Sequence, residues 1–248
     1  MMSKSDTRRF SESPKFLLDR LNQSRHVWDY WRCSGPHVVE MGTVRGLGVG
    51  LPTHFHAEDQ ITFVLVGRRR FYVGGALVEV SAGNAVRIPA GTPHRSLDEE
   101  SEVVCVNVYA NAASDGSQAD IAGLASACGC HEPVSALQWP VQVGHHTSLG
   151  VLPVAMDDME LLRQKPVAQA ALRMGMTREG FSRKIKKAYG IAPQEIGLMA
   201  RLNNARQLLQ QGHHTAAAAA ASGFSDQSHP GRCFVRTFGV TPGRYRAG

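Results

Sequence analysis

The chain has no hydrophobic segment suited to crossing a membrane, because no apolar run approaches the roughly 20 residues that a spanning helix requires. Residues 1–20 carry scattered charges in place of the apolar stretch of a secretory signal peptide. The sequence therefore predicts a cytoplasmic protein with no membrane partner.

Cysteine is scarce. The five cysteines are an odd number, and in an intracellular chain they do not suggest a disulfide framework. Cys128, Cys130 and His131 lie close together in the sequence. One residue between two cysteines is tighter than usual zinc spacing, and the other ligands are missing, so this cluster is disfavoured as a zinc site.

Acidic residues are scarce in the C-terminal part of the chain. Residues 152–248 contain 14 Lys and Arg against 6 Asp and Glu, whereas residues 1–151 contain 13 against 15. A local excess of positive charge is the expected footprint of a surface that neutralises nucleic-acid phosphates, although solvated lysines also produce such an excess without any partner.

Short apolar stretches punctuated by glycines fill the first half of the chain. Short strands with glycine turns, uninterrupted by a long helical period, indicate an antiparallel sandwich or barrel. The expected strands cover residues 38–44, 47–51, 61–66, 70–73, 77–80, 85–88 and 103–109.

Two segments of this region carry ligand chemistry. Because residues two apart on a strand project from the same face, His54 and His56 are expected to point together into the barrel. The second segment, residues 83–94, ends at His94. The spacing resembles the two motifs of the cupin superfamily, a small β-barrel whose interior binds a metal or a small ligand. Metal-dependent cupins have two His and a Glu, then a His; the resemblance implies a site at His54, His56, Gln60 and His94.

Gln60 departs from the cupin pattern, because its neutral amide is a weaker oxygen donor than a carboxylate. Three imidazoles can still hold zinc with a fourth position open, so His54, His56 and His94, with Gln60, are a candidate site for zinc or a similar divalent ion. In the alternative, the same four residues hydrogen-bond one another, a water or an organic effector, as in regulator-type cupins.

An aromatic group and an arginine run in this half are interpreted as structural and not as parts of the ligand site. Trp28, Tyr30 and Trp31 precede the first expected strand and are expected to pack on the outside of the barrel. The run Arg68-Arg69-Arg70 at an expected hairpin turn is interpreted as a solvated edge that discourages aggregation between strands.

Two matching half-patterns occupy the C-terminal part. Gly175-Met176-Thr177 and Gly190-Ile191-Ala192-Pro193 recur as Gly223-Phe224-Ser225 and Gly239-Val240-Thr241-Pro242. Each half predicts a helix, a glycine turn, a second helix and a stop, which is a helix-turn-helix. In the first half, a helix begins at Pro166 and a second covers residues 178–189, apolar on one face and basic on the other as a major-groove helix requires.

A helix over residues 193–211 is predicted to join the two units. Nineteen residues give a length of about 28 Å. A rigid connector of this length can place two recognition helices in successive major grooves, about 34 Å apart.

Several short motifs in the C-terminal part together resemble those of one protein family. Arg201-Leu202, Ala205-Arg206, Gly223-Phe224-Ser225, Phe238-Gly239-Val240-Thr241-Pro242 and Tyr245-Arg246 resemble the DNA-binding domain of the AraC/XylS family of transcription regulators over the last 95 residues or so. The resemblance implies binding to double-stranded promoter DNA as a homodimer, with a cupin-like sensor for a small-molecule effector. The implied DNA-binding residues are Arg178, Glu179, Ser182, Arg183, Lys186 and Lys187 in the first unit, and Gln227, Ser228, Arg232 and Arg236 in the second.

The second unit departs from the family at Pro230, where an aromatic residue is usual. A helix beginning after Ser225 would contain this proline in its second turn, at a cost of about 3 kcal/mol. The helix therefore either begins later, capped by Ser228, or is kinked. Because the preceding helix, residues 215–221, is nearly all alanine and buries little area, we expect the second unit to be less stable and to contribute less sequence reading than the first.

The sequence thus predicts two domains, an all-β cupin barrel followed by an all-α tandem helix-turn-helix. The expected boundaries are a flexible arm at 1–25, the barrel at 26–110, a linker with a dimerisation helix at 111–151 and the DNA-binding domain at 152–248. The leading hypothesis is a transcription regulator without enzymatic activity. The alternative is a metal-dependent cupin enzyme, an oxygenase or isomerase, with accessory DNA binding.

Overall fold

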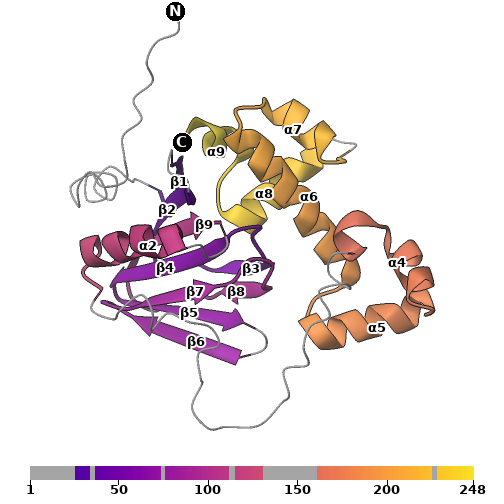
Figure 1. Ribbon diagram of the computed structural model, residues 1–248, viewed down its shortest axis with the longest axis horizontal. Coiled ribbons are helices and arrows are strands. Elements are labelled where there is room, and N and C mark those ends of the chain that lie inside the picture. The colour runs from indigo at the N-terminus through magenta and orange to yellow at the C-terminus, as the bar shows by residue number, and fades with distance from the viewer. Residues whose placement is uncertain (1–25, 34–36, 74–75, 112–114, 131–160, 225–227) are drawn as a thin grey trace, which may run out of the picture.

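The computed structural model describes residues 26–33, 37–73, 76–111, 115–130, 161–224 and 228–248. Strands occupy the first part of the chain and helices the last (Figure 1). The predicted division into an all-β and an all-α region is confirmed. Within the described residues, no helix has the length and apolar character that spanning a membrane requires.

Two antiparallel sheets form the barrel, one in the order β1-β2-β9-β4-β7 and the other in the order β3-β8-β5-β6. The strands are β1 (Trp28–Arg32), β2 (Val38–Gly46), β3 (Leu51–His54), β4 (Asp59–Val66), β5 (Arg68–Val73), β6 (Ala76–Ser81), β7 (Ala85–Ile88), β8 (His94–Ser96) and β9 (Val103–Ala110). The sequence predicted neither β1 nor β8, and the strand expected at 47–51 begins instead at Leu51 and ends at His54.

The five-stranded sheet is buried on both faces. Along β4, Thr62 and Val64 face the barrel interior, whereas Ile61 and Phe63 belong to a separate apolar cluster on the other face. Helix α2 (Asp115–Ala127) covers that outer face through an apolar stripe. The stripe consists of Ile121, Leu124 and Ala125, which pack with Trp31, Met41 and Val108.

The aromatic residues of β1 correct the sequence-based interpretation. Because side chains alternate along a strand, Trp28 and Tyr30 face the barrel interior and only Trp31 packs outside. Trp28 lines the interior cavity, and the ring of Tyr30 lies 6.2 Å from that of Tyr109.

Six helices build the two helix-turn-helix units. They are α4 (Val167–Arg173), α5 (Arg178–Tyr189), α6 (Pro193–Gln210), α7 (Thr215–Ala221), α8 (Ser228–Phe238) and α9 (Pro242–Ala247). The turns pass through Gly175 and Gly223, whose φ angles of 64° and 79° favour glycine. Thr177 caps α5 by accepting a hydrogen bond from the Gly180 amide.

The described part of α8 runs from Ser228 to Phe238 and contains Pro230. Residues 225–227 lie outside the described residues, so the two arrangements expected for this proline, a later helix start and a kink, stay predictions.

The barrel and the helical region share one core. A single cluster of buried side chains extends from Val64 and Tyr109 in the barrel to Leu202 on α6 and to Phe234 and Phe238 on α8. The Tyr30 hydroxyl donates to the Phe238 carbonyl at 2.9 Å, and Arg244 of α9 donates to the Trp28 carbonyl at 2.9 Å. Figure 1 shows α8 and α9 against the barrel, while α4 and α5 project away from it.

This shared core makes α8 a stability element for the whole chain. We expect Phe238→Ala to lower the free energy of unfolding by about 3 kcal/mol, because a buried aromatic is replaced by a cavity. Val235→Ala on the same helix is the control, since Val235 is 40% exposed and its truncation should cost under about 0.5 kcal/mol. Urea unfolding of both variants measures the difference; equal effects would show that α8 is not part of the core.

Candidate functional site

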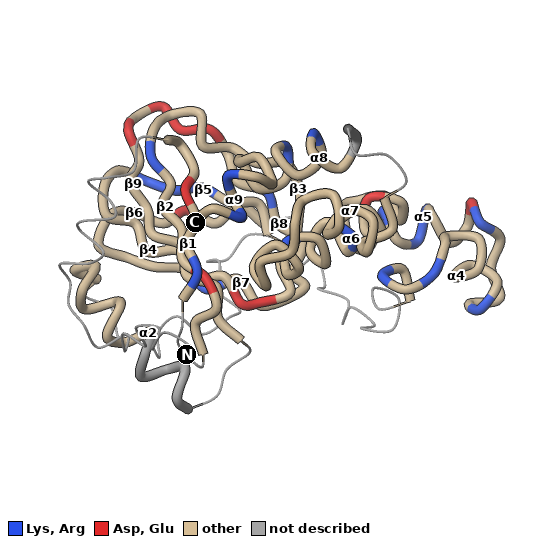
Figure 2. The backbone as a smooth tube through the Cα atoms, turned by 90° about the horizontal axis from the view of Figure 1, so that it is seen from above, with Lys and Arg blue, Asp and Glu red and all other residues tan. Residues whose placement is uncertain are grey.

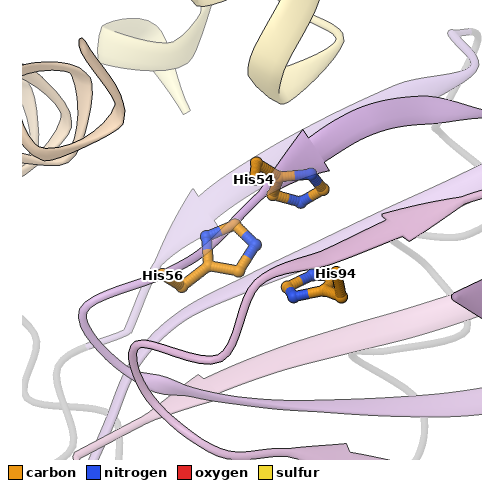
Figure 3. A group of neighbouring side chains, drawn as sticks. All are labelled: His54, His56 and His94. Atoms are coloured by element: carbon orange, nitrogen blue, oxygen red, sulfur yellow. The ribbon is translucent and has the colours of Figure 1, made fainter. Parts of the chain in front are cut away.

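Three histidines meet inside the barrel. His54 is the last residue of β3, His56 follows it by two positions, and His94 begins β8 directly opposite His54. Figure 3 shows the three rings converging, with ring centroids 4.4 to 5.4 Å apart. One ligand atom from each lies within 4.8 Å of the others, and all three side chains are buried. The structure therefore brings together the three histidines proposed as ligands from the sequence.

Burial keeps the three rings neutral. Desolvation lowers the pKa of His54 and of His56 well below the ordinary value, and lowers the pKa of His94 to about 4. Neutral imidazole is the form that binds a metal ion, because each ring then keeps one nitrogen lone pair. The site is thus chemically prepared for a cation.

Backbone carbonyls orient two of the rings. His54 Nδ1 lies 2.8 Å from the Pro52 carbonyl, and His94 Nδ1 lies 2.9 Å from the Thr92 carbonyl. Since a carbonyl only accepts, both Nδ1 atoms carry the proton and both Nε2 atoms keep the lone pair. This arrangement is typical of metal-ligating histidines.

Gln60 on β4 lies beside the triad, as the sequence predicted. Its Oε1 is 3.2 Å from His94 Nε2. The Gln60 amide donates to Thr62 Oγ1 at 3.0 Å, and Thr62 donates to Asn107 Oδ1 at 2.7 Å. In this orientation two lone pairs, on Gln60 Oε1 and His94 Nε2, face each other, and a cation between them would stabilise the pair.

The cavity at the triad is small. Its volume is about 10 Å³, close to the minimum that holds one water molecule. Pockets for organic ligands measure roughly 300–1,000 Å³. In this closed arrangement the barrel can therefore admit an ion and a water but not an organic effector. Besides His54, Gln60 and His94, the lining includes Trp28, Arg69, Phe71, Asn107 and Tyr109.

Arg69 corrects the interpretation of the arginine run. Its side chain is 1% exposed and donates to the carbonyls of Val49 and Leu97, the latter at 2.7 Å. It also lies over the Phe71 ring at 5.3 Å. Arg69 thus lies on the cavity wall and not on a solvated edge, and alternation with Phe71 along β5 is the sequence signal that could have identified it.

Arg206 of α6 is buried against the barrel and was missed as a site residue. Its guanidinium bonds to Glu40 at 2.8 Å and to Glu58 at 2.9 Å, and its Nε donates to the Tyr245 hydroxyl at 3.0 Å. It lies 4.5 Å from the centre of the Tyr109 ring. Burial alone would lower the pKa of Arg206, but Glu40, Tyr245 and Glu58 raise it overall, so the group is a buried cation.

Neighbouring groups complete this interface between the barrel and α6. Gln210 donates to the same Glu40 oxygen, and Asn203 donates to the Phe55 carbonyl at 2.8 Å. Asn203, Arg206 and Gln210 lie on one face of α6, at helical spacing. The buried pair of carboxylates and this polar helix face form the interdomain cluster, which consists of Glu40, Glu58, Asn203, Arg206, Gln210 and Tyr245.

Among the described residues, the three histidines alone group as metal ligands. Cys128 and Cys130 pack near the outer cluster under α2, where burial raises the pKa of both thiols. His131, the third member of that sequence cluster, lies outside the described residues.

The predicted DNA-binding residues divide between the two units. Arg178, Glu179, Arg183, Lys186 and Lys187 of α5 are exposed, opposite the buried Phe181 and Ile185, and Ser182 is half-buried. On α8, Arg232 and Arg236 are exposed opposite Phe234 and Phe238. Ser228 begins α8, and Gln227 lies outside the described residues. Figure 2 shows Lys and Arg along α5 and on α8.

Comparison with known proteins agrees with both halves of the structure. The helix-turn-helix domain family matches residues 161–248, and the cupin domain family matches residues 44–109. No curated protein matches the chain.

Two solved structures resemble this chain, one over part of its length and the other over most of it. An AraC-type transcriptional regulator from Chromobacterium violaceum is 30% identical over 37% of this chain and 88% of its own, with a TM-score of 0.35. Unsaturated fatty acid bound ToxT from Vibrio cholerae is 13% identical over 87% of this chain and 97% of its own, with a TM-score of 0.53, which is a likeness of fold. The chain therefore belongs to the AraC-type regulators that carry a cupin domain before two helix-turn-helix units.

Proposed function

We propose that this DNA-binding regulator senses a divalent cation, zinc or a similar ion, at His54, His56 and His94 inside its cupin barrel. The observation that carries the proposal is the convergence of three buried, neutral imidazoles, whose ligand atoms lie within 4.8 Å of one another, beside a cavity of about 10 Å³ that His54 and His94 line.

The residues present fit such an ion. Zinc in proteins takes nitrogen ligands at 2.0–2.1 Å in tetrahedral geometry, which requires them about 3.4 Å apart. The three ligand atoms lie within 4.8 Å of one another, so small ring movements would complete the site. Gln60 Oε1 or a water would supply the fourth position, and the bound ion would supply positive charge at the centre of the barrel.

A second candidate ligand is an organic effector. The structure of ToxT contains an unsaturated fatty acid, which supports a ligand of this class in a protein of similar fold. The small cavity disfavours it here, because a volume of about 10 Å³ has no room for an organic molecule.

The DNA side of the proposal rests on the exposed basic residues of α5 and α8. Both helices bury their apolar faces and leave arginines exposed, and an arginine paired to guanine contributes about 1–3 kcal/mol of discrimination. We propose that the chain acts without catalysis and binds promoter DNA as a homodimer. Since the apolar stripe of α2 packs on the chain's own sheet, the dimer contact would use other residues.

Metal binding tests the sensor. Isothermal titration of the metal-free protein with zinc should give one site per chain, and His94→Ala should weaken binding at least about 100-fold because it removes a ligand. His213→Ala is the matched control, since His213 is exposed between α6 and α7. Unchanged affinity in His94→Ala would contradict the proposed site. Stoichiometric iron or manganese, together with no binding to the DNA upstream of the chain's own gene, would favour the enzyme alternative.

DNA binding tests the two units. We expect Arg183→Ala to cost about 1–3 kcal/mol of affinity for the specific site and Arg232→Ala to cost less, because the alanine-rich α7 supports the second unit weakly. Gel shifts at fixed salt and footprinting of the two half-sites measure both. Arg95→Ala, on the barrel, should leave affinity unchanged. Equal losses of DNA affinity at both half-sites would refute the prediction that the second unit contributes less to sequence reading than the first.

A further inference from the structure

His56 differs from the other two histidines in what faces its Nδ1 atom. His54 and His94 each place Nδ1 against a backbone carbonyl, whereas His56 Nδ1 faces Nη1 of Arg206 at 3.4 Å. A guanidinium can only donate, so His56 Nδ1 must hold the lone pair. In a neutral ring the proton is then on Nε2.

This tautomer has a direct chemical consequence. Nε2 of His56 faces the other two rings (Figure 3) and is the buried atom that has no partner. With a proton on it, Nε2 has no lone pair to offer an ion. Two of the three histidines are therefore prepared as ligands, and the third is held in the wrong tautomer.

Arg206 cannot easily leave His56 by itself. The side chain is 1% exposed, carries ion pairs to Glu40 and Glu58, and is fixed on α6, the helix that joins both helix-turn-helix units. Movement of its guanidinium away from His56 would break these pairs and disturb the contact between α6 and the barrel.

We propose that Arg206 is a latch that keeps His56 from ligating a cation, so that a closed interdomain cluster and an occupied triad exclude each other. The proposal rests on the cation site proposed above and assigns its regulation to one residue of the DNA-binding domain. Because binding linkage is reciprocal, an ion in the triad weakens the attachment of α6 to the barrel by the same factor as the latch weakens ion binding.

Glu58 is positioned to replace Arg206 as the hydrogen-bond partner of His56. Arg206 Nη1 donates to Glu58 Oε2 at 2.9 Å and also faces His56 Nδ1, so the carboxylate and the imidazole are neighbours across one nitrogen atom. When Arg206 withdraws, Glu58 can accept from a protonated His56 Nδ1. The His56 Nε2 lone pair then becomes available, and the carboxylate orients the ring as outer partners of metal-ligating histidines do.

The tautomers can be observed without any metal. Nitrogen-15 spectra of the metal-free full chain, with His56→Gln for assignment, should show the Nε2–H tautomer for His56 and the Nδ1–H tautomer for His54 and His94. An Nδ1–H tautomer at His56 in the wild-type protein would overturn the latch and leave the cation site itself standing.

Zinc titration tests the coupling. We expect Arg206→Met to bind zinc about ten-fold more tightly than the wild type, or tighter still. Glu58→Gln, combined with Arg206→Met, should reverse the gain by about ten-fold because a neutral amide oxygen is a weaker acceptor for His56 than the carboxylate. Arg201→Met is the control on the same helix, since among the described residues Arg201 lies over Phe224 and bonds to Gly223, away from the histidines, and it should bind zinc as the wild type does.

Amide hydrogen exchange gives an independent readout. Saturating zinc should increase exchange at residues 28–32 and 242–247, which meet across the interface, and should not change it in the Arg206→Met protein. Equal zinc affinity in wild type and Arg206→Met overturns the latch alone. Absence of zinc binding in every variant overturns the cation site and the latch with it.

Discussion

The buried charge of Arg206 is the constraint on which the arrangement of the two domains depends. A guanidinium removed from water is tolerated only when carboxylates neutralise it and hydrogen bonds satisfy its donors. Glu40 and Glu58 of the barrel supply the charge, and Tyr245 of α9 supplies a hydrogen-bond partner. The barrel and the helical region therefore fit together as one body around a single ion cluster.

The same cluster lies next to the barrel interior. Arg206 packs against the rings of Tyr109 and Phe238, and Tyr109 also lines the cavity, which has room for about one water molecule. Three neutral imidazoles at such a cavity favour an ion over an organic molecule. Because Arg206 belongs to α6, the chemistry of the cavity is connected directly to the helix that carries both DNA-binding units.

Local sequence patterns were sufficient for the helical domain and for most strands. The helix over Arg178–Tyr189 was predicted with its bounds, because a capping threonine, an apolar stripe and a C-terminal glycine all lie within one segment. The histidine triad was also predicted, since period-two spacing and a motif resemblance identify it.

Long-range packing was not accessible from the sequence. Arg206 is one of two arginines on α6, and nothing adjacent to it indicates that Glu40, 166 positions earlier, becomes its partner. Arg69 was read as part of a charged run because the run conceals the alternation of β5. Trp28 and Tyr30 were placed outside because β1 pairs with β2 through a connection that has no local signature.

The central claim is that the state of the barrel interior sets the behaviour of the DNA-binding units. The most direct test is the affinity of the full chain for its promoter DNA, measured by fluorescence anisotropy with and without saturating zinc at constant salt. The account predicts that zinc changes the dissociation constant about five-fold or more in the wild type and leaves it unchanged in Arg206→Met. Identical affinities with and without zinc in the wild-type protein would contradict it.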